Sequence, residues 1–420
     1  MATAFGRWIR ESRVAAEGAL TTATAATTRP RVDSIDALRG TIMIIMALDH
    51  VRDMIHRGAM SSSPTDLATT TPILFLTRWI THICAPVFMF TAGLGVYLWW
   101  QRGRTKGQLS RYLATRGLWL VFLEITVMRL AYNFDFAQSY PILLIVLWAL
   151  GACMIVMSAL VWLPVRMLAV LSVATIALHN LLDGIQASSF GSGAPLWNVL
   201  HQPGAFPIGS ALVIVGYPLI PWVAVMALGF SFGPLFQMEA GKRRRYLLGI
   251  GAAMTVAFLV VRGINVYGDP APWSAQRSAT FTLLSFLNTT KYPPSLAFLL
   301  MTLGPALIML GLFDRMSFRS SNPVIVFGRV PLFYFVTHFY LAHIASVLLA
   351  IAKYGSAAWA FVFHPVPSMG GPVKLFPPDF GFDLWVAYAV WAAIVIGLYP
   401  ACRWFAGVKA RRKDWWLSYL

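Results

Sequence analysis

Residues 295–313 read SLAFLLMTLGPALIMLGLF, an apolar run without a single charged side chain. A helix needs about 20 such residues to cross the hydrocarbon core of a bilayer, so this run predicts a transmembrane helix. The full set of such runs is 37–55, 73–100, 113–132, 141–163, 165–182, 211–236, 246–264, 295–313, 322–351 and 384–406. The longest of them are expected to tilt, or to kink at Pro86 or Pro331. The sequence therefore predicts an all-α, polytopic membrane helix bundle of about ten transmembrane helices.

The composition of the whole chain agrees with these runs. Hydrophobic residues make up 58% of the 420 positions and charged residues only 12%, whereas a soluble globular protein has about 25% charged residues. This difference excludes a soluble cytosolic enzyme, a disordered chain and a small disulfide-rich protein. The 16 tryptophans fit aromatic belts at the two membrane surfaces. The three cysteines show no spacing typical of metal ligands.

The net charge of +17 reflects the topology of the chain. Most of the 33 Lys and Arg residues fall in segments that lie inside if the N-terminus is cytoplasmic, such as the cluster 242–245 and the tail 409–413. Positively charged loops favour the cytoplasmic side, so both termini are predicted to be cytoplasmic, with the protein in the cell inner (plasma) membrane. The basic excess is therefore no sign of nucleic-acid binding.

Three regions are expected along the chain. Residues 1–30 lack a long apolar run, which argues against a cleaved signal peptide and predicts a cytoplasmic segment, either amphipathic or disordered. Residues 31–406 form the transmembrane domain, and residues 407–420 form a cytoplasmic basic tail. The Gly-, Pro- and Trp-rich stretches near 190–210 and 355–380 are expected to be structured loops, or to hold an eleventh span or a re-entrant segment.

The first predicted span carries charged groups toward both ends. Arg39 and His50 are separated by eleven steps of about 100°, so both side chains face the same side of the helix, about 16 Å apart. Asp53 lies three residues after His50 and is expected to hold its imidazole ring. The alternatives are that Arg39 reaches lipid headgroups and that residues 49–53 form a solvated cap. A metal site made by Asp49, His50 and Asp53 is disfavoured because adjacent helical residues point apart, and no metal is expected.

Other polar residues lie deep in predicted spans, where a charge is costly and therefore indicates function. Arg78 and His82 are four residues apart on one helical face. Glu124 lies in the third predicted span and His338 in the ninth. Each histidine alone is readily explained as a buried, hydrogen-bonded residue, but three spans that carry His50, His82 and His338 favour a shared polar centre.

Several segments resemble one membrane enzyme family. They are residues 31–40 (RVDSIDALRG), 49–50 (DH), 81–88 (THICAPVF), 291–296 (KYPPSL), 329–334 (RVPLFY) with His338, and 414–417 (DWWL). In these segments the sequence resembles the heparan-alpha-glucosaminide N-acetyltransferase catalytic-domain family, within the transmembrane acyltransferase superfamily. The resemblance covers nearly the whole chain from residue 30 to residue 420.

The spacing from Arg39 to His50 is also similar to the arginine-to-histidine motif of bacterial membrane O-acyltransferases that modify surface polysaccharides. In those relatives the histidine is assigned the catalytic role, and their basic motif in the third span is similar to Arg111 and Arg116. Residues 61–77 contain no histidine, although the animal lysosomal member has its proposed catalytic histidine there. The resemblance therefore assigns the catalytic role to His50.

The resemblance implies transfer of an acetyl or other acyl group from cytoplasmic acyl-CoA, such as acetyl-CoA, to an acceptor at the outer face. The implied partners are the lipid bilayer, acyl-CoA and a sugar or glycan acceptor, with a homodimer as an option for the assembly. Two other interpretations stay open. One is a proton-coupled transporter that uses the intramembrane charges, and the other is a non-catalytic scaffold of envelope assembly.

The implied site divides into three sets of residues. The residues that would bind the CoA phosphates are Arg39, Arg111 and Arg116. The catalytic set is His50, Asp49, Asp53, His82 and Arg78. The secondary candidates are His338, Lys291 and Glu124. Within the catalytic set His50 would act as a general base or become acylated, and Arg78 or His82 would stabilise the oxyanion.

Overall fold

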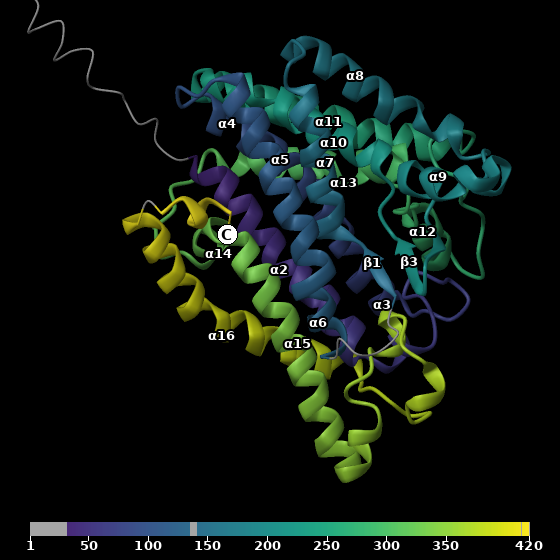
Figure 1. Cartoon of the computed structure of the whole chain (residues 1–420). Helices are drawn as coiled ribbons and strands as arrows, with labels where there is room; N and C mark the ends of the chain where they lie inside the picture. Colours follow the sequence, from purple (N-terminus) through teal and green to yellow (C-terminus); the bar gives the residue numbers. More distant parts are fainter. Residues whose placement is uncertain (1–31, 135–140, 413, 420) are drawn as a thin grey trace, which may run out of the picture. The chain divides into compact units, whose positions relative to one another are not determined.

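The computed structural model describes residues 32–134, 141–412 and 414–419, most of which are helical. The predicted N-terminal segment 1–30 lies outside the described residues. The α-helices are α2 (Asp33–Ile55), α3 (Pro72–Trp79), α4 (Cys84–Trp100), α5 (Lys106–Leu123), α6 (Arg129–Asn133), α7 (Val146–Leu160), α8 (Val165–Leu178), α9 (Ala194–Leu200), α10 (Leu219–Ser231), α11 (Ala240–Ile264), α12 (Ala279–Leu287), α13 (Leu296–Phe313), α14 (Pro323–Arg329), α15 (Pro331–Tyr354) and α16 (Leu384–Arg411) (Figure 1).

Short helical turns connect or extend these helices. A π-helical turn, η3 (Glu124–Met128), joins α5 to α6. The 3₁₀ turns are η1 (Arg57–Met60), η2 (Ile80–Ile83), η4 (His179–Leu182), η5 (Ala187–Gly193), η6 (Gly233–Gln237), η7 (Gly355–Ala360), η8 (Pro367–Met369), η9 (Val373–Leu375) and η10 (Trp415–Ser418). The stretches 190–210 and 355–380 thus contain only short elements, none of which is long enough to span a bilayer.

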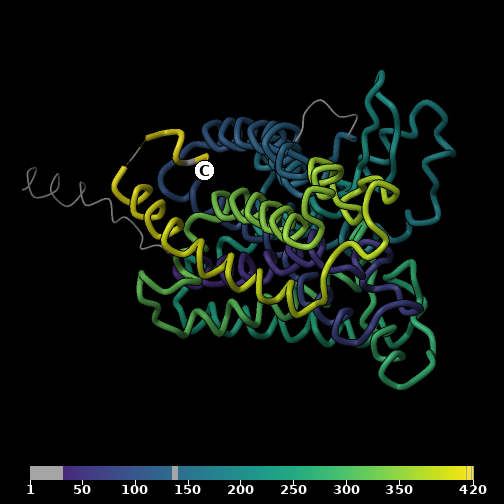
Figure 2. Tube along the Cα trace, turned by 90° about the horizontal axis from the view of Figure 1, so that it is seen from below, coloured from purple at the N-terminus to yellow at the C-terminus, as the bar shows by residue number. Residues whose placement is uncertain are grey.

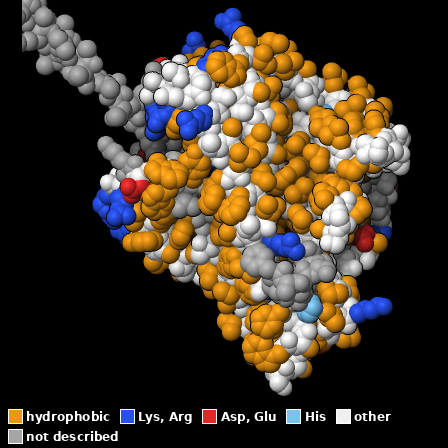
Figure 3. Space-filling model, viewed as in Figure 1, with side chains coloured by type: hydrophobic (Ala, Val, Ile, Leu, Met, Phe, Trp, Pro, Cys, Tyr) orange, Lys and Arg blue, Asp and Glu red, His pale blue; other side chains and the backbone are white. Residues whose placement is uncertain are grey.

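The prediction of a helical membrane protein is confirmed. In the described part of the chain, seven helical segments are long and apolar enough to cross a membrane. The segments that meet these criteria are Pro72–Trp100, Val165–Leu182, Leu219–Gln237, Ala240–Ile264, Leu296–Phe313, Pro331–Ala360 and Leu384–Arg411. The other three predicted spans also contain helices, but α2 and α5 carry several charged residues and α7 is short. Hydrophobic side chains cover much of the face shown in Figure 3, as a lipid-facing surface requires.

The all-α class is confirmed, and the structure adds one small sheet that the sequence did not predict. Three strands, β1 (Ile142–Leu144), β2 (Gly204–Ile208) and β3 (Ala211–Val215), form a sheet in the order β1-β3-β2. β3 pairs parallel to β1 and antiparallel to β2, across a two-residue turn that begins at Gly209 with φ of 59°. Two predicted spans, 141–163 and 211–236, therefore begin as strands. Hydropathy alone cannot distinguish a short apolar strand from the end of an apolar helix.

Two long predicted spans are divided in the structure. The segment 73–100 consists of α3, the 3₁₀ turn η2 and α4, and Pro86 lies in the first turn of α4. The segment 322–351 consists of α14 and α15, which are separated at Val330. Pro331 begins the second helix, where its fixed φ is favourable and its missing N–H costs nothing.

The helix α2 lies at the centre of the helical domain. It contacts α4, α13, α14, α15 and α16, and Figure 2 shows it in purple between them. At its N-terminal end, Asp33 lies 3.5 Å from the guanidinium of Arg329, the last residue of α14. Its polar residues are therefore held among helices from both halves of the sequence.

Glycines allow several helix pairs to approach closely. A methyl group added at Gly40 of α2 would lie 1.7 Å from the Val324 carbonyl oxygen of α14. The pairs α5/α7 and α11/α13 meet in the same way at Gly117 and Gly251. Small residues let membrane helices pack backbone against backbone, where the hydrophobic effect gives little attraction between helices.

The contact between α4 and α10 gives a test of this packing. A Cβ at Gly229 would lie 1.9 Å from the Phe90 carbonyl oxygen, so Gly229→Ala must push the two helices apart. We expect a loss of about 1–3 kcal/mol in the free energy of unfolding, measured by denaturation in mixed micelles. Gly249→Ala in α11 is the matched control, because nothing lies within 4 Å of its added Cβ. Equal stability of the two variants would contradict the close approach.

The C-terminal tail packs against the helical domain. α16 continues to Arg411, beyond the predicted end of the span at residue 406. After it, Leu417 is buried, and the Tyr419 hydroxyl lies 2.7 Å from the Thr115 hydroxyl of α5. The Tyr419 ring also contacts Tyr112, which lines the cavity described below.

Candidate active site

Two histidines from distant parts of the sequence form the centre of the site. His50, in the last third of α2, has its Nδ1 2.7 Å from Nε2 of His338 in α15. The Nδ1 atom of His338 lies 2.9 Å from the carbonyl oxygen of Tyr334, one helical turn earlier. His338 is fully buried, whereas His50 is only half-buried. The sequence predicted a polar centre with both histidines but not this hydrogen bond.

The hydrogen-bond chain assigns the protons of both rings. A carbonyl oxygen only accepts, so Nδ1 of His338 must donate to Tyr334. In a neutral His338, Nε2 then carries the lone pair and accepts the proton on Nδ1 of His50. The Nε2 atom of His50 is consequently left with its lone pair. A half-buried imidazole in this tautomer can accept a proton or attack an electrophile.

The carboxylates of α2 form ion pairs with arginines. Asp49 binds Arg78 of α3 and lies 2.8 Å from Arg52. Arg52 is only 1% exposed, and it also lies 2.6 Å from Asp53. Asp53 therefore contacts Arg52 and not His50. The partner of the His50 ring is His338, whereas the sequence predicted Asp53. The geometric reason is that the rings of α2 and α15 meet where the two helices pack, while Asp53 lies nearly one turn further along α2.

His82 and Lys291 lie around the same ion pairs. Lys291, in the loop before α13, is close enough to act electrostatically on Asp49, His50 and His82. His82 is 4% exposed, and its ring packs on Phe298 of α13. Polar residues of α2, α3, η2 and the loop before α13 therefore lie around Asp49, and α15 adds His338 beside His50.

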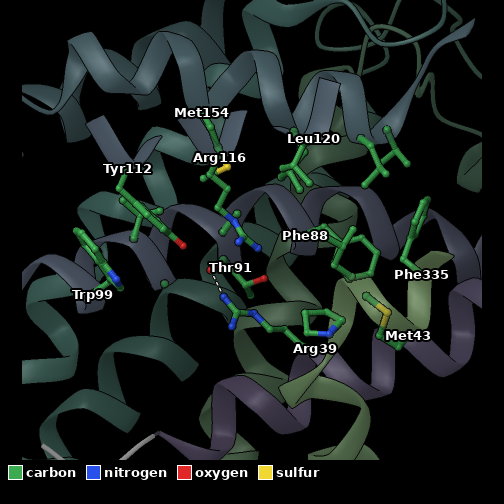
Figure 4. A pocket seen from close by; sticks show the side chains of 18 residues that line it. Arg39, Met43, Phe88, Thr91, Trp99, Tyr112, Arg116, Leu120, Met154 and Phe335 are labelled. Carbon is green, nitrogen blue, oxygen red and sulfur yellow. Dashed lines mark hydrogen bonds between the residues drawn. The ribbon is translucent and has the colours of Figure 1, made fainter. Parts of the chain in front are cut away.

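A cavity of about 260 Å³ lies beside this centre, between α2, α4, α5, α7 and α15. Figure 4 shows Trp99 and Tyr112 at one end, Arg39 and Arg116 in the middle, and Phe335 toward the other end. The guanidinium of Arg39 donates a hydrogen bond to the Thr91 carbonyl oxygen. Two guanidinium groups among mostly apolar walls suit a ligand with an anionic part and an apolar arm.

Phe335 lies between the cavity and the histidine pair. The ring of Phe335 lines the cavity, and its centroid lies 6.1 Å from that of His50 in an edge-to-face contact. Arg39 and His50 belong to one continuous helix, and eleven residues at the usual helical rise separate them by about 16 Å along its axis. The cavity thus leads from the two arginines to the ring that covers His50.

Two other expected site residues lie apart from the cavity and the histidines. Arg111 is exposed on α5 and does not line the cavity, because five helical steps place it about 140° away from Arg116. Glu124 is buried, and its carboxylate accepts hydrogen bonds from the backbone N–H groups of Leu147 (2.8 Å) and Trp148 (3.1 Å). It therefore caps the N-terminus of α7, whose first N–H groups have no helical partner.

Sequence reasoning missed Arg52, Phe335 and the carbonyl of Tyr334 as parts of the site. The spacing of Tyr334 and His338, one turn apart, gave a weak signal for their contact. Nothing local to Arg52 distinguishes a buried arginine from a surface one near a helix end. Phe335 is one apolar residue among many in its helix.

One protein-family model matches more than half of the chain. The model of the family described as heparan-alpha-glucosaminide N-acetyltransferase, catalytic, matches residues 31–266, more than half of the chain. This range contains His50, His82 and both arginines of the cavity, whereas Lys291 and His338 lie beyond it. Among the curated proteins, none matches the sequence. The chain therefore belongs to the heparan-alpha-glucosaminide N-acetyltransferase catalytic-domain family of membrane acetyltransferases.

Proposed function

We propose that this protein transfers an acetyl group from cytoplasmic acetyl-CoA to a sugar or glycan-type acceptor on the outer side of the inner (plasma) membrane. The observation that carries the proposal is the cavity with Arg39 and Arg116, which ends at the ring covering His50. The basic loops support cytoplasmic termini, which would place the arginines near the inside and His50 toward the outside.

In this proposal the arginines bind the phosphates of CoA. Arg39 and Arg116 offer charge-assisted hydrogen bonds, and the apolar walls accept the pantetheine arm. An extended pantetheine arm is comparable in length to the separation of about 16 Å between Arg39 and His50 along α2. Rotation of the Phe335 side chain would open the end of the cavity and admit the thioester to His50.

His50 then activates the acceptor. Its Nε2 takes the proton from an acceptor hydroxyl or amine, the acceptor atom attacks the thioester carbonyl, and the carbon–sulfur bond breaks. The CoA thiolate leaves and receives the proton from His50. Transfer through an acetyl-histidine would use the same Nε2 atom. Lys291, His82 and Arg78 supply positive or hydrogen-bonding groups near the carbonyl oxygen of the thioester. All residues of this site come from one chain.

Binding of acetyl-CoA is the first test of this function. We expect the purified protein in detergent to bind acetyl-CoA by calorimetry, and Arg39→Ala to weaken binding about 10- to 100-fold through loss of a charged hydrogen-bond donor. Arg102→Ala removes the same charge from the exposed loop after α4, outside the cavity, and serves as the matched control.

Two results would contradict the proposal. One is the absence of acetyl-CoA binding at millimolar ligand. The other is an equal loss of affinity in Arg39→Ala and Arg102→Ala, which would indicate a diffuse charge effect rather than a site. Solute uptake driven by a pH gradient, without dependence on acetyl-CoA, would instead support a transporter. Turnover with hexoses and amino sugars then identifies the acceptor class.

A further inference from the structure

A second cluster of potential ligands lies at the end of α8, apart from the histidine pair. His179 and Asp183, on and just after η4, meet His201, which follows α9. One ligand atom from each of the three residues lies within 4.8 Å of the others. We propose that His179, Asp183 and His201 bind a divalent transition-metal ion, with Zn²⁺ as the best fit.

Both histidines are buried, and three of their four ring nitrogens have no hydrogen-bond partner among the described residues. His179 is 3% exposed and His201 is 2% exposed. Among the described residues, no hydrogen bond reaches either ring nitrogen of His179 or Nδ1 of His201. Nε2 of His201 does have a partner, the Oδ1 atom of Asp183 at 3.1 Å. Buried polar groups normally have partners, so the unsatisfied His179 ring, with a nitrogen within 4.8 Å of this pair, indicates a missing cation. The Pro294 carbonyl lies near the His179 ring.

The separation of the ligand atoms fits a small tetrahedral ion. Zn²⁺ bonds of about 2.0–2.2 Å in a tetrahedron place neighbouring ligand atoms about 3.3 Å apart. Nε2 of His201 and Oδ1 of Asp183 are 3.1 Å apart, which already matches this edge. The His179 ring needs to approach by at most about 1.5 Å, given the spread of ligand atoms described above.

Neighbouring groups already orient the ligands. The other oxygen of Asp183 accepts a hydrogen bond of 2.7 Å from the Asn180 side chain, and the Trp197 ring packs on His201. Such outer contacts are typical of metal centres, where they hold ligands in their binding orientation. Two imidazoles and one carboxylate favour zinc-like ions over Ca²⁺ or Mg²⁺, which prefer oxygen ligands. A water molecule would complete the tetrahedron.

The ion would fasten two segments that are separate in sequence. It links the end of α8 to the segment after α9, which leads into β2. The side-chain oxygen of Asn180, which also holds Asp183, accepts a hydrogen bond from the Leu296 N–H. The proposed metal site is therefore connected to the start of α13, close in sequence to Lys291. The proposed role is therefore to order the loops beside the acetyltransferase site, and it does not depend on that function.

The test uses the full chain purified in detergent, stripped with chelator and then titrated with ZnCl₂. We expect one zinc per chain by elemental analysis in the wild type, and a loss of affinity of at least about 100-fold in His201→Gln. His364→Gln, which changes a half-buried histidine elsewhere, is the matched control and is expected to bind like the wild type.

The spectrum of Co²⁺ bound to the wild-type chain tests the geometry without any variant. Intense visible bands of four-coordinate cobalt, displaced by zinc, are expected. Three results would overturn the proposal: no tightly bound zinc in the wild type, equal zinc affinity in His201→Gln and His364→Gln, or only the weak spectrum of six-coordinate cobalt. The circular dichroism spectrum of His201→Gln should equal that of the wild type, which would show that the variant is folded and that its loss of zinc affinity has another cause.

Discussion

His50→Ala is expected to lower the rate of acetyl transfer by roughly 100- to 10,000-fold, the range for removal of a general base. The fold and the affinity for acetyl-CoA should be preserved, because His50 lies beyond the Phe335 ring that closes the cavity. The measurement is turnover with radiolabelled acetyl-CoA, beside acetyl-CoA binding by calorimetry. His364→Ala is the matched control and should retain full turnover.

The partner His338 separates a catalytic role of His50 from a structural one. His338 touches His50 rather than the substrate, so it is a positioning residue that fixes the His50 tautomer. His338→Gln should lower kcat with little change in KM for acetyl-CoA. If the two histidines act as a unit, the double variant His50→Ala/His338→Gln should be no slower than His50→Ala alone.

Two outcomes would contradict this assignment. Near-full turnover of His50→Ala would exclude His50 as the base or nucleophile. Independent, multiplicative losses in the double variant would show that His338 acts on its own, in contact with substrate. Either result would move the chemistry toward His82 and Lys291, which lie around the same ion pairs.

The helical part of the fold follows from the sequence because the signal is local. A run such as 295–313 must satisfy its own backbone hydrogen bonds in lipid, so it becomes the helix α13 wherever it packs. The strands β1 and β3 lacked such a signal. Each is short and apolar, and its partner lies about 70 residues away in sequence, so pairing depends on the tertiary structure.

The site shows the same division between local and distant information. The separation of Arg39 and His50 was predictable because it depends only on the helix repeat. The helix repeat also places Arg111 and Arg116 on different faces of α5, and only Arg116 lines the cavity. His50 and His338 are 288 positions apart in the sequence, so the pattern of residues within either helix cannot predict their contact. His179 and His201 likewise belong to separate elements without a metal-binding motif.

Asp49→Ala is expected to cause the largest loss of stability of any single change in the site. Asp49 is the shared partner of Arg78 and of Arg52, whose side chain is almost completely buried. Removing one partner of a buried ion pair leaves an uncompensated charge and costs about 3–5 kcal/mol. We expect this loss in the free energy of unfolding measured in mixed micelles.

A surface ion pair provides the control for this prediction. Lys353 and Asp379 are 2.8 Å apart, but Asp379 is largely exposed, so Asp379→Ala should leave the unfolding transition unchanged. Asp49→Asn keeps the shape and one acceptor but not the charge, and its stability should lie between wild type and Asp49→Ala. If Asp49→Ala were as stable as Asp379→Ala, water would have to reach both arginines in the folded protein. The polar centre would then be open to water. Water screens charges, so Lys291 and Arg78 would stabilise the charge on the substrate carbonyl much less than in a buried site.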